Sequence, residues 1–131
     1  MNEKTKGILA DTTVWIEFFR TRSKTGDILE SLIKEGSVWL CGTVLFEILQ
    51  GVRTEEEKAN VLEMLSDLPY VEMSQPLWQK ASEISASLRK IGLNLPLSDI
   101  LIAAVAIRNN FSVFTLDKHF EQIPGLKIYR S

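Results

Sequence analysis

The chain has 131 residues, of which 45% are hydrophobic, and a formal net charge of −2 at pH 7. This length and composition suffice for one ordinary hydrophobic core and are too small for two, so we expect a single domain over residues 1–131. No apolar run approaches the roughly 18 residues that span a bilayer, and the run near the N-terminus is too short for a signal peptide, so the expected location is cytoplasmic. The one cysteine, Cys41, cannot form a disulfide within the chain and is interpreted as a small buried apolar residue.

Short apolar runs typical of strands alternate with longer helical patterns, which predicts an α/β fold, a three-layer α/β/α sandwich with a mostly parallel central sheet. The first half is expected to contain, in order, a strand at 7–10, a helix capped by Thr12 or Thr13, a helix at 25–34, a strand at 38–41 and a helix capped by Thr43. The second half should continue with a helix at 55–65, a strand at 70–73, helices at 76–90 and 99–108, the latter capped by Ser98, and strands at 112–115 and 126–129. The helix at 99–108 is apolar on every side and is expected inside the protein.

Four carboxylates stand beside or within apolar runs: Asp11 after 8–10, Glu47 after 44–46, Asp99 before 100–102 and Asp117 after 113–116. An ionised carboxylate at the edge of a core loses several kcal/mol of hydration unless a cation, a backbone donor or another partner replaces the water. Ligands of open parallel sheets bind outside the carboxyl ends of the strands, where we expect Asp11 and Asp117. The amino ends of helices are expected to bring Asp99 and Glu47, the latter in about the first turn of its helix, toward the same crevice.

Clustered carboxylates repel one another, and a hard divalent cation reverses this repulsion. Neither the cysteine nor the one histidine is expected beside the cluster, and ligation by oxygen alone favours Mg²⁺ or Mn²⁺ over Zn²⁺. Without these four acids the 15 basic residues of the chain outnumber the remaining acidic ones. The charge balance therefore permits a nucleic-acid partner without indicating one.

Each acid also has a simpler explanation when it is taken alone. Asp11 and Asp99 could cap helices, and Asp117 could form an Asx-turn. Capping does not explain Glu47 inside a strongly apolar helix, so a metal cluster explains the four acids together better than four separate roles. His119 is interpreted as a turn residue, and the lack of a second histidine excludes a two-histidine nuclease and a multi-histidine zinc site.

Other conspicuous residues have less specific interpretations. The tryptophans are interpreted as core or dimer contacts in preference to base-stacking platforms; they are Trp15, Trp39 and Trp78. The basic residues after the first helix and after the Glu47 helix could contact RNA phosphate or a protein, or lie on a solvated face; they are Arg20, Arg22, Lys24 and Arg53.

The four acids lie in segments that resemble the four signatures of the PIN-domain ribonucleases: ADTTVW at 10–15, VLFEILQGVR at 44–53, LSDILIAA at 97–104 and TLDKHF at 115–120. The order and spacing of the segments match as well, and the resemblance covers essentially the whole chain. Within that family the sequence is most similar to the VapC-type toxins of prokaryotic toxin–antitoxin pairs.

The resemblance implies a Mg²⁺-dependent endoribonuclease that hydrolyses RNA phosphodiester bonds, with Mn²⁺ as a possible substitute. It also implies the toxin of a type II toxin–antitoxin system, held inactive by a small cognate antitoxin and often a homodimer. The acidic quartet carries over as the catalytic, metal-binding set, which is Asp11, Glu47, Asp99 and Asp117. Thr13 and Thr115 match positions where the family often has a hydroxyl residue, and they are expected to support the site or position water.

Three other functions were weighed. A receiver domain would need adjacent acids after the first strand, where this chain has Asp11, Thr12 and Thr13. A haloacid-dehalogenase-type phosphatase would need an aspartate at position 13. A catalytically silent PIN-like protein-binding module would keep the fold, but the intact acids at all four positions count against it.

Overall fold

Five short strands form the centre of the fold in the computed structural model, which describes residues 7–20 and 22–131. The strands are β1 (Ile8–Ala10), β2 (Val38–Cys41), β3 (Tyr70–Val71), β4 (Ser112–Phe114) and β5 (Lys127–Ile128). They lie in the order β3-β2-β1-β4-β5, and every neighbouring pair is parallel. The predicted parallel sheet is therefore confirmed, with β5 at its edge.

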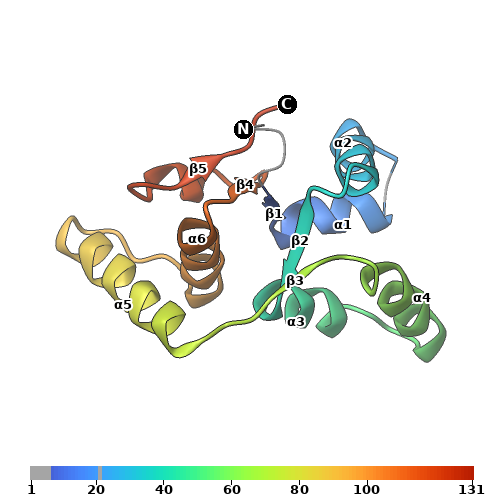
Figure 1. The fold of residues 1–131 in the computed structure, drawn as a ribbon, viewed down its shortest axis with the longest axis horizontal. Coiled ribbons are helices and arrows are strands. Elements are labelled where there is room, and N and C mark those ends of the chain that lie inside the picture. The colour runs from blue at the N-terminus through green and yellow to red at the C-terminus, as the bar shows by residue number, and fades with distance from the viewer. Residues whose placement is uncertain (1–6, 21) are drawn as a thin grey trace.

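Helices cover both faces of this sheet. They are α1 (Thr12–Arg20), α2 (Lys24–Lys34), α3 (Gly42–Gln50), α4 (Glu55–Leu65), α5 (Gln75–Lys90) and α6 (Leu97–Asn109), followed by the short 3₁₀ helix η2 (Lys118–Gln122). Figure 1 shows α1 and α2 packed together on one side of the sheet and α5 and α6 on the other. Helix α3 follows β2 directly and contacts both α1 and α6. This arrangement confirms the predicted α/β/α sandwich.

The apolar helix α6 forms the middle of the core. Every residue from 100 to 106 is buried, as its uniformly apolar sequence predicts. Cys41 is also buried, and Trp15 is fully enclosed. Trp78, by contrast, is 49% exposed on α5, so its interpretation as a core residue is wrong. None of the helices in the described residues is long and apolar enough to cross a membrane.

The predicted caps of α6 and α3 are wrong. Helix α6 begins two residues earlier than expected, with Pro96 as the capping residue and no side-chain cap from Ser98. Proline fixes its own φ angle near −65°, which suits the entry to a helix. Helix α3 begins at Gly42 after Cys41, and the hydroxyl of Thr43 faces the sulfur of Met73 at 3.5 Å and does not cap the helix.

Candidate active site

The carboxyl ends of β1 and β4 meet at one edge of the sheet. Ala10 at the end of β1 pairs with Phe114 at the end of β4, and the backbone N–H of Asp11 donates to the Phe114 carbonyl at 3.0 Å. The segment 115–117 leaves the sheet at the same level. The fold therefore brings Asp11 to the same edge of the sheet as Thr115 and Asp117. Thr115 follows Asp11 by 104 residues in the sequence.

Asp11 is the buried anchor of this edge. Only 3% of the residue is exposed, and among the described residues it is the one buried charged side chain. Its Oδ1 atom accepts hydrogen bonds from the Thr13 hydroxyl at 2.5 Å and the Val14 N–H at 3.3 Å, and its Oδ2 atom accepts one from the Thr115 hydroxyl at 2.6 Å. Burial raises the pKa of Asp11, and these donors oppose the rise. The residue that caps the amino end of α1 is therefore Asp11, and the predicted caps Thr12 and Thr13 are wrong.

The two threonine hydroxyls link Asp11 to the chain segment that carries Asp117. The Thr13 hydroxyl accepts a hydrogen bond from the Leu116 N–H at 3.2 Å, and the Thr115 hydroxyl accepts one from the Asp117 N–H at 2.9 Å. Each hydroxyl thus donates to Asp11 and accepts from the backbone that follows β4. This pattern fixes the position of the Asp117 backbone relative to the Asp11 carboxylate.

Glu47 reaches the site from the second turn of α3, one turn later than expected. The amino end of α3 therefore does not position its carboxylate. The hydroxyl of Thr12 instead donates a short hydrogen bond to Glu47 Oε1, and α1 packs against α3. Sequence reasoning missed Thr12, because three consecutive polar residues give no sign of which hydroxyl faces which acid.

Asp99 lies in the first turn of α6, with 17% of its side chain exposed. Desolvation, together with the negative charges of the other three acids, raises the pKa of Asp99 to about 6, and His119 opposes this rise. An electrostatic effect of this kind requires the carboxylates to lie close together. The structure therefore gathers the four predicted acids at one place, while their catalytic and metal-binding roles remain predictions.

His119 stands beside two of these acids. Its backbone N–H donates to Asp117 Oδ1 at 2.9 Å, and its Nδ1 atom lies 3.1 Å from the same oxygen and 4.0 Å from Asp99 Oδ2. Ligand atoms of Asp99, Asp117 and His119 all lie within 4.8 Å of one another. The expectation that no histidine accompanies the acids is therefore wrong. The 3₁₀ turn of η2 folds residue 119 back over Asp117, and the two-residue spacing was the available signal.

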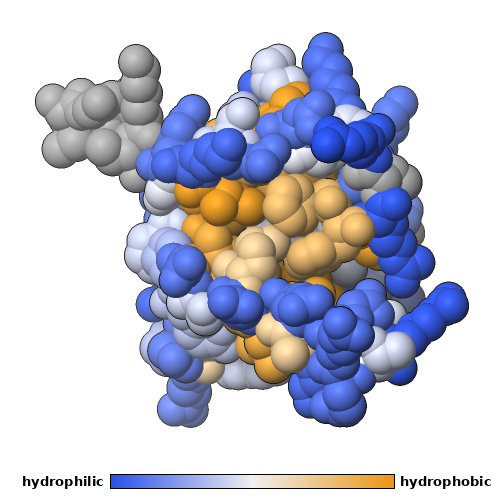
Figure 2. Space-filling model, turned by 90° about the vertical axis from the view of Figure 1, so that its right-hand side faces the viewer, coloured by the Kyte–Doolittle hydropathy of each residue, from blue (hydrophilic) through white to orange (hydrophobic). Residues whose placement is uncertain are grey.

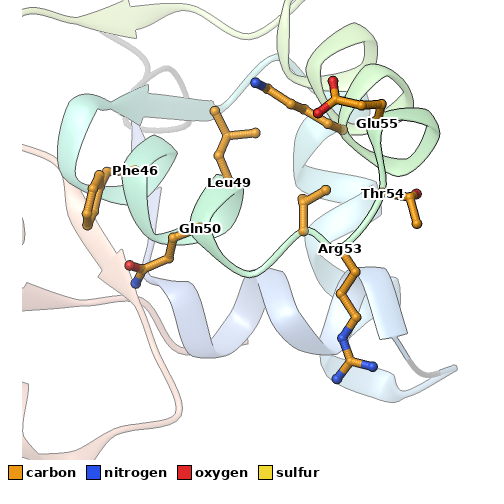
Figure 3. Close-up of a pocket in the computed structure, with 8 residues that line it drawn as sticks. Phe46, Leu49, Gln50, Arg53, Thr54 and Glu55 are labelled. Atoms are coloured by element: carbon orange, nitrogen blue, oxygen red, sulfur yellow. The ribbon is translucent and has the colours of Figure 1, made fainter.

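Two surface hollows are lined by residues of α3, the helix that carries Glu47. A pocket of about 440 Å³ runs along the outer side of α3 to the start of α4, and Figure 3 shows Phe46, Leu49 and Gln50 projecting from α3 at this pocket. Its other lining residues are Val52, Arg53, Thr54, Glu55 and Lys58. A narrower apolar groove lies between α1, α3 and α4, lined chiefly by Trp15, Ile16, Phe19, Ile48 and Val61, with Glu47 also in its wall.

The apolar groove opens onto an apolar surface. Figure 2 shows an apolar patch ringed by hydrophilic side chains on the face where α1, α2 and α4 lie. On this face Ile16 is 46% exposed, and Phe19 and Leu62 are also exposed. Contiguous apolar surface of this kind on a small protein marks an interaction site.

Comparison with known proteins identifies the family. The model of the PIN domain family matches residues 8–126. Ribonuclease VapC1 of Methanocaldococcus jannaschii is 31% identical over 127 residues, which cover 93% of this chain and 86% of that protein.

Solved structures with the same fold include DNA-bound VapBC from Salmonella typhimurium, with a TM-score of 0.83, 23% identity and coverage of 95% and 97% of the two chains. A toxin–antitoxin complex from Klebsiella pneumoniae has a TM-score of 0.77 and 20% identity, and covers 95% of this chain and 100% of that one. The fold, the order of the four acidic segments and a family match over nearly all of the sequence agree, and the chain belongs to the PIN domain family.

Proposed function

We propose that this protein is a divalent-metal-dependent endoribonuclease and acts as the toxin of a type II toxin–antitoxin pair. The observation that carries the proposal is the gathering of Asp11, Glu47, Asp99 and Asp117 at the carboxyl edge of the sheet. Among the ion pairs of the described residues, none joins a lysine or an arginine to any of these four acids. A site with this much uncompensated negative charge calls for cations.

The donor set fits a divalent ion. Carboxylate oxygens of Asp99 and Asp117 lie within 4.8 Å of each other. Desolvation and then the charges of the other acids raise the pKa of Asp99, and a bound cation would offset both effects. We assign metal binding to the four acids, with Mg²⁺ as the ion and Mn²⁺ as a substitute. When bound, such an ion lowers the pKa of a water molecule and offsets the charge that develops on a phosphodiester.

The chain's own residues would hold this site in shape. The Thr13 and Thr115 hydroxyls keep both oxygens of Asp11 in fixed directions, and Thr12 does the same for one oxygen of Glu47. Because these positions are set before substrate binds, little reorganisation is needed when charge develops. Thr13 and Thr115 therefore serve as positioning residues, consistent with the roles that the family resemblance implies for them.

We assign the pocket along α3 to the RNA strand. It lies on the same helix as Glu47, and one of its lining residues, Phe46, directly precedes Glu47 in the sequence. Phe46 is 66% exposed and offers a face on which an unpaired base can stack, and Gln50 offers amide groups for a base edge. Arg53 and Lys58 in the same pocket supply positive charge for phosphates, with Glu55 as the opposing charge.

We assign the apolar groove to the antitoxin. Most of its lining residues are apolar, and the charged residues that line it are Arg20, Glu47 and Glu57. A partner segment seated there would therefore contact one acid of the site, Glu47. The structural neighbours with this fold include proteins described as VapBC and as a toxin–antitoxin complex. An amphipathic helix that buries its apolar side in the groove is the occupant that fits this surface.

We propose that the protein is a single domain and that it acts in the cytoplasm as a homodimer. The support for the dimer is the family resemblance and the large exposed side chain of Trp78 on α5. Aromatic side chains of this size are enriched at protein interfaces. Sedimentation of the purified chain would give the oligomeric state directly.

The test of the proposed activity is cleavage of a mixed cellular RNA pool by antitoxin-free protein, with Mg²⁺ and with EDTA. The Asp99→Asn variant, prepared identically, controls for contaminating nucleases. Discrete cuts that need the metal and are absent from the variant would support the proposal and give the target through the fragment ends. If the metal binds and no RNA in the pool is cut, the catalytically silent protein-binding module becomes the better description, and the apolar groove its functional site.

A further inference from the structure

The acidic site contains a nitrogen atom placed like a metal ligand. His119 is the one histidine of the chain, and η2 places its imidazole beside Asp99 and Asp117. The Nδ1 atom of the ring faces the carboxylates. It lies 3.1 Å from Asp117 Oδ1 and 4.0 Å from Asp99 Oδ2. About half of the side chain is exposed, so the imidazole is not held there by burial in the core.

These two distances fit the geometry of a six-coordinate ion. With metal–ligand bonds of about 2.1 Å, neighbouring ligands of an octahedral ion are about 3.0 Å apart and opposite ligands about 4.2 Å apart. The separation between Nδ1 and Asp117 Oδ1, 3.1 Å, corresponds to a neighbouring pair. The separation between Nδ1 and Asp99 Oδ2, 4.0 Å, approaches an opposite pair.

The identity of the third donor changes which ion the site selects. A set of carboxylates alone suits hard ions such as Mg²⁺, which bind oxygen and hold their waters tightly. Imidazole is a ligand of first-row transition-metal ions and contributes little to Mg²⁺ binding. An imidazole nitrogen added to the carboxylate ligands therefore shifts the preference away from Mg²⁺.

We propose that His119 Nδ1 is a ligand of the divalent ion, together with Asp99 and Asp117, and that it makes the site prefer a transition-metal ion such as Mn²⁺ to Mg²⁺. The inference rests on the proposed metal site, adds a nitrogen to its donor set and replaces Mg²⁺ by Mn²⁺ as the preferred ion. In the alternative arrangement, Nδ1–H donates a hydrogen bond to Asp117 and His119 only orients that carboxylate. The two arrangements differ in whether the nitrogen is bonded to the ion.

Because the chain has a single histidine, isotope labelling can decide between these arrangements. Protein is prepared with ordinary histidine and with ¹⁵N-histidine, loaded with Mn²⁺ and examined by pulsed electron paramagnetic resonance. A directly bound imidazole nitrogen gives a strong modulation, and its frequency changes from the ¹⁴N to the ¹⁵N value on labelling. The label acts in the wild-type protein, so the result does not depend on how a variant folds.

Calorimetric titrations with Mn²⁺ and Mg²⁺ then measure the preference. His119→Asn should weaken Mn²⁺ binding by about tenfold or more and Mg²⁺ binding by less. Glu121→Gln is the matched control, because Glu121 lies in the same 3₁₀ turn and pairs with Arg130 at 3.6 Å, outside the site. It should leave both affinities unchanged.

The outcomes separate this inference from the proposed function. Bound Mn²⁺ without a histidine nitrogen signal would overturn the ligand assignment and leave the carboxylate metal site in place. Equal losses of Mn²⁺ and Mg²⁺ affinity in His119→Asn would overturn the claim of selectivity. If wild-type protein binds neither ion, both the ligand assignment and the metal-dependent function fail.

Discussion

The acidic site has two halves that are built differently. The inner half is Asp11 with Thr13 and Thr115, where a buried carboxylate is held by three protein donors. The outer half is Asp99, Asp117 and His119, which are more exposed and crowded by one another's charges. The contrast shows that the fold itself satisfies the carboxylate of Asp11 and leaves the two carboxylates of the outer half, Asp99 and Asp117, to be satisfied by something that binds.

This difference has a physical origin. Asp11 follows the central strand β1, where a charge without partners would cost several kcal/mol, so neutral donors from two segments surround it. Asp99 and Asp117 lie further out, where solvent lowers that cost, and their mutual repulsion persists in the protein without metal. The inner half is therefore expected to govern stability and the outer half to govern metal binding.

The largest predicted effects come from replacing one acid in each half by its amide. Both Asp11→Asn and Asp99→Asn should reduce RNA cleavage by about 10²-fold or more, because each removes charge from the site. The stability of the metal-free proteins should change in opposite directions. Asp99→Asn relieves repulsion and should raise the melting temperature. Asp11→Asn places an amide N–H among three donors and should cost about 1–3 kcal/mol of unfolding free energy.

Thermal melts and cleavage assays on the same preparations measure both quantities. Asp27→Asn, an exposed acid on α2, serves as the control and should change neither. Equal destabilisation by Asp11→Asn and Asp99→Asn would contradict the distinction between the halves.

Removing one hydroxyl should weaken the inner half alone. Thr115→Val leaves Asp11 Oδ2 and the Asp117 N–H without their partner, which should cost about 1–3 kcal/mol in denaturant unfolding. Thr115→Ser retains the hydroxyl and should recover most of this loss. If valine and serine behave alike, the hydroxyl does not hold Asp11.

The stability of the metal-free protein should depend on pH through the outer half. The pKa of Asp99 is about 6 in the folded protein against 3.8 in the unfolded chain, so the folded state binds this proton more tightly. Asp99 therefore favours folding at low pH, and this contribution is lost as the pH rises from about 4 to about 6. Burial also raises the pKa of Asp11, so this group likewise favours folding at low pH.

The measurement is the unfolding free energy of wild type minus that of Asp99→Asn between pH 5 and pH 7.5. This difference should fall as the pH rises, and saturating Mn²⁺ should abolish the fall, because the ion stabilises the ionised carboxylate. A difference that is independent of pH without metal would show that neither burial nor the charges of the other acids raise the pKa of Asp99.

The smallest effect is expected in the apolar groove. Ile16→Ser removes an exposed apolar side chain from the far side of α1 and should change stability by about 0.5 kcal/mol or less. Metal binding and RNA cleavage should stay at wild-type levels, while binding of a fluorescent apolar dye to the groove should decrease. A loss of cleavage would show that the groove and the acidic site are coupled.

The sequence was informative where one physical signal dominates. Short apolar runs predicted all five strands, the continuous apolar sequence predicted the buried helix α6, and the positions of the four acids beside apolar runs indicated a site. The caps at Ser98 and Thr43 were wrong, because neighbouring residues with equal capping ability compete and packing decides between them. His119 and Thr12 were missed because their contacts depend on a 3₁₀ turn and on how α1 meets α3. Neither the 3₁₀ turn nor the contact between α1 and α3 produces a periodic pattern in the sequence.

The central claim is that the outer half of the acidic site binds a divalent ion beside the fixed carboxylate of Asp11. Anomalous diffraction from crystals soaked in Mn²⁺ tests it most directly, because the scattering locates the ion itself. The account predicts a peak at about 2.2 Å from carboxylate oxygens of both Asp99 and Asp117, and no peak in Asp99→Asn crystals treated in the same way. A peak elsewhere on the protein, with none between these two acids, would contradict it.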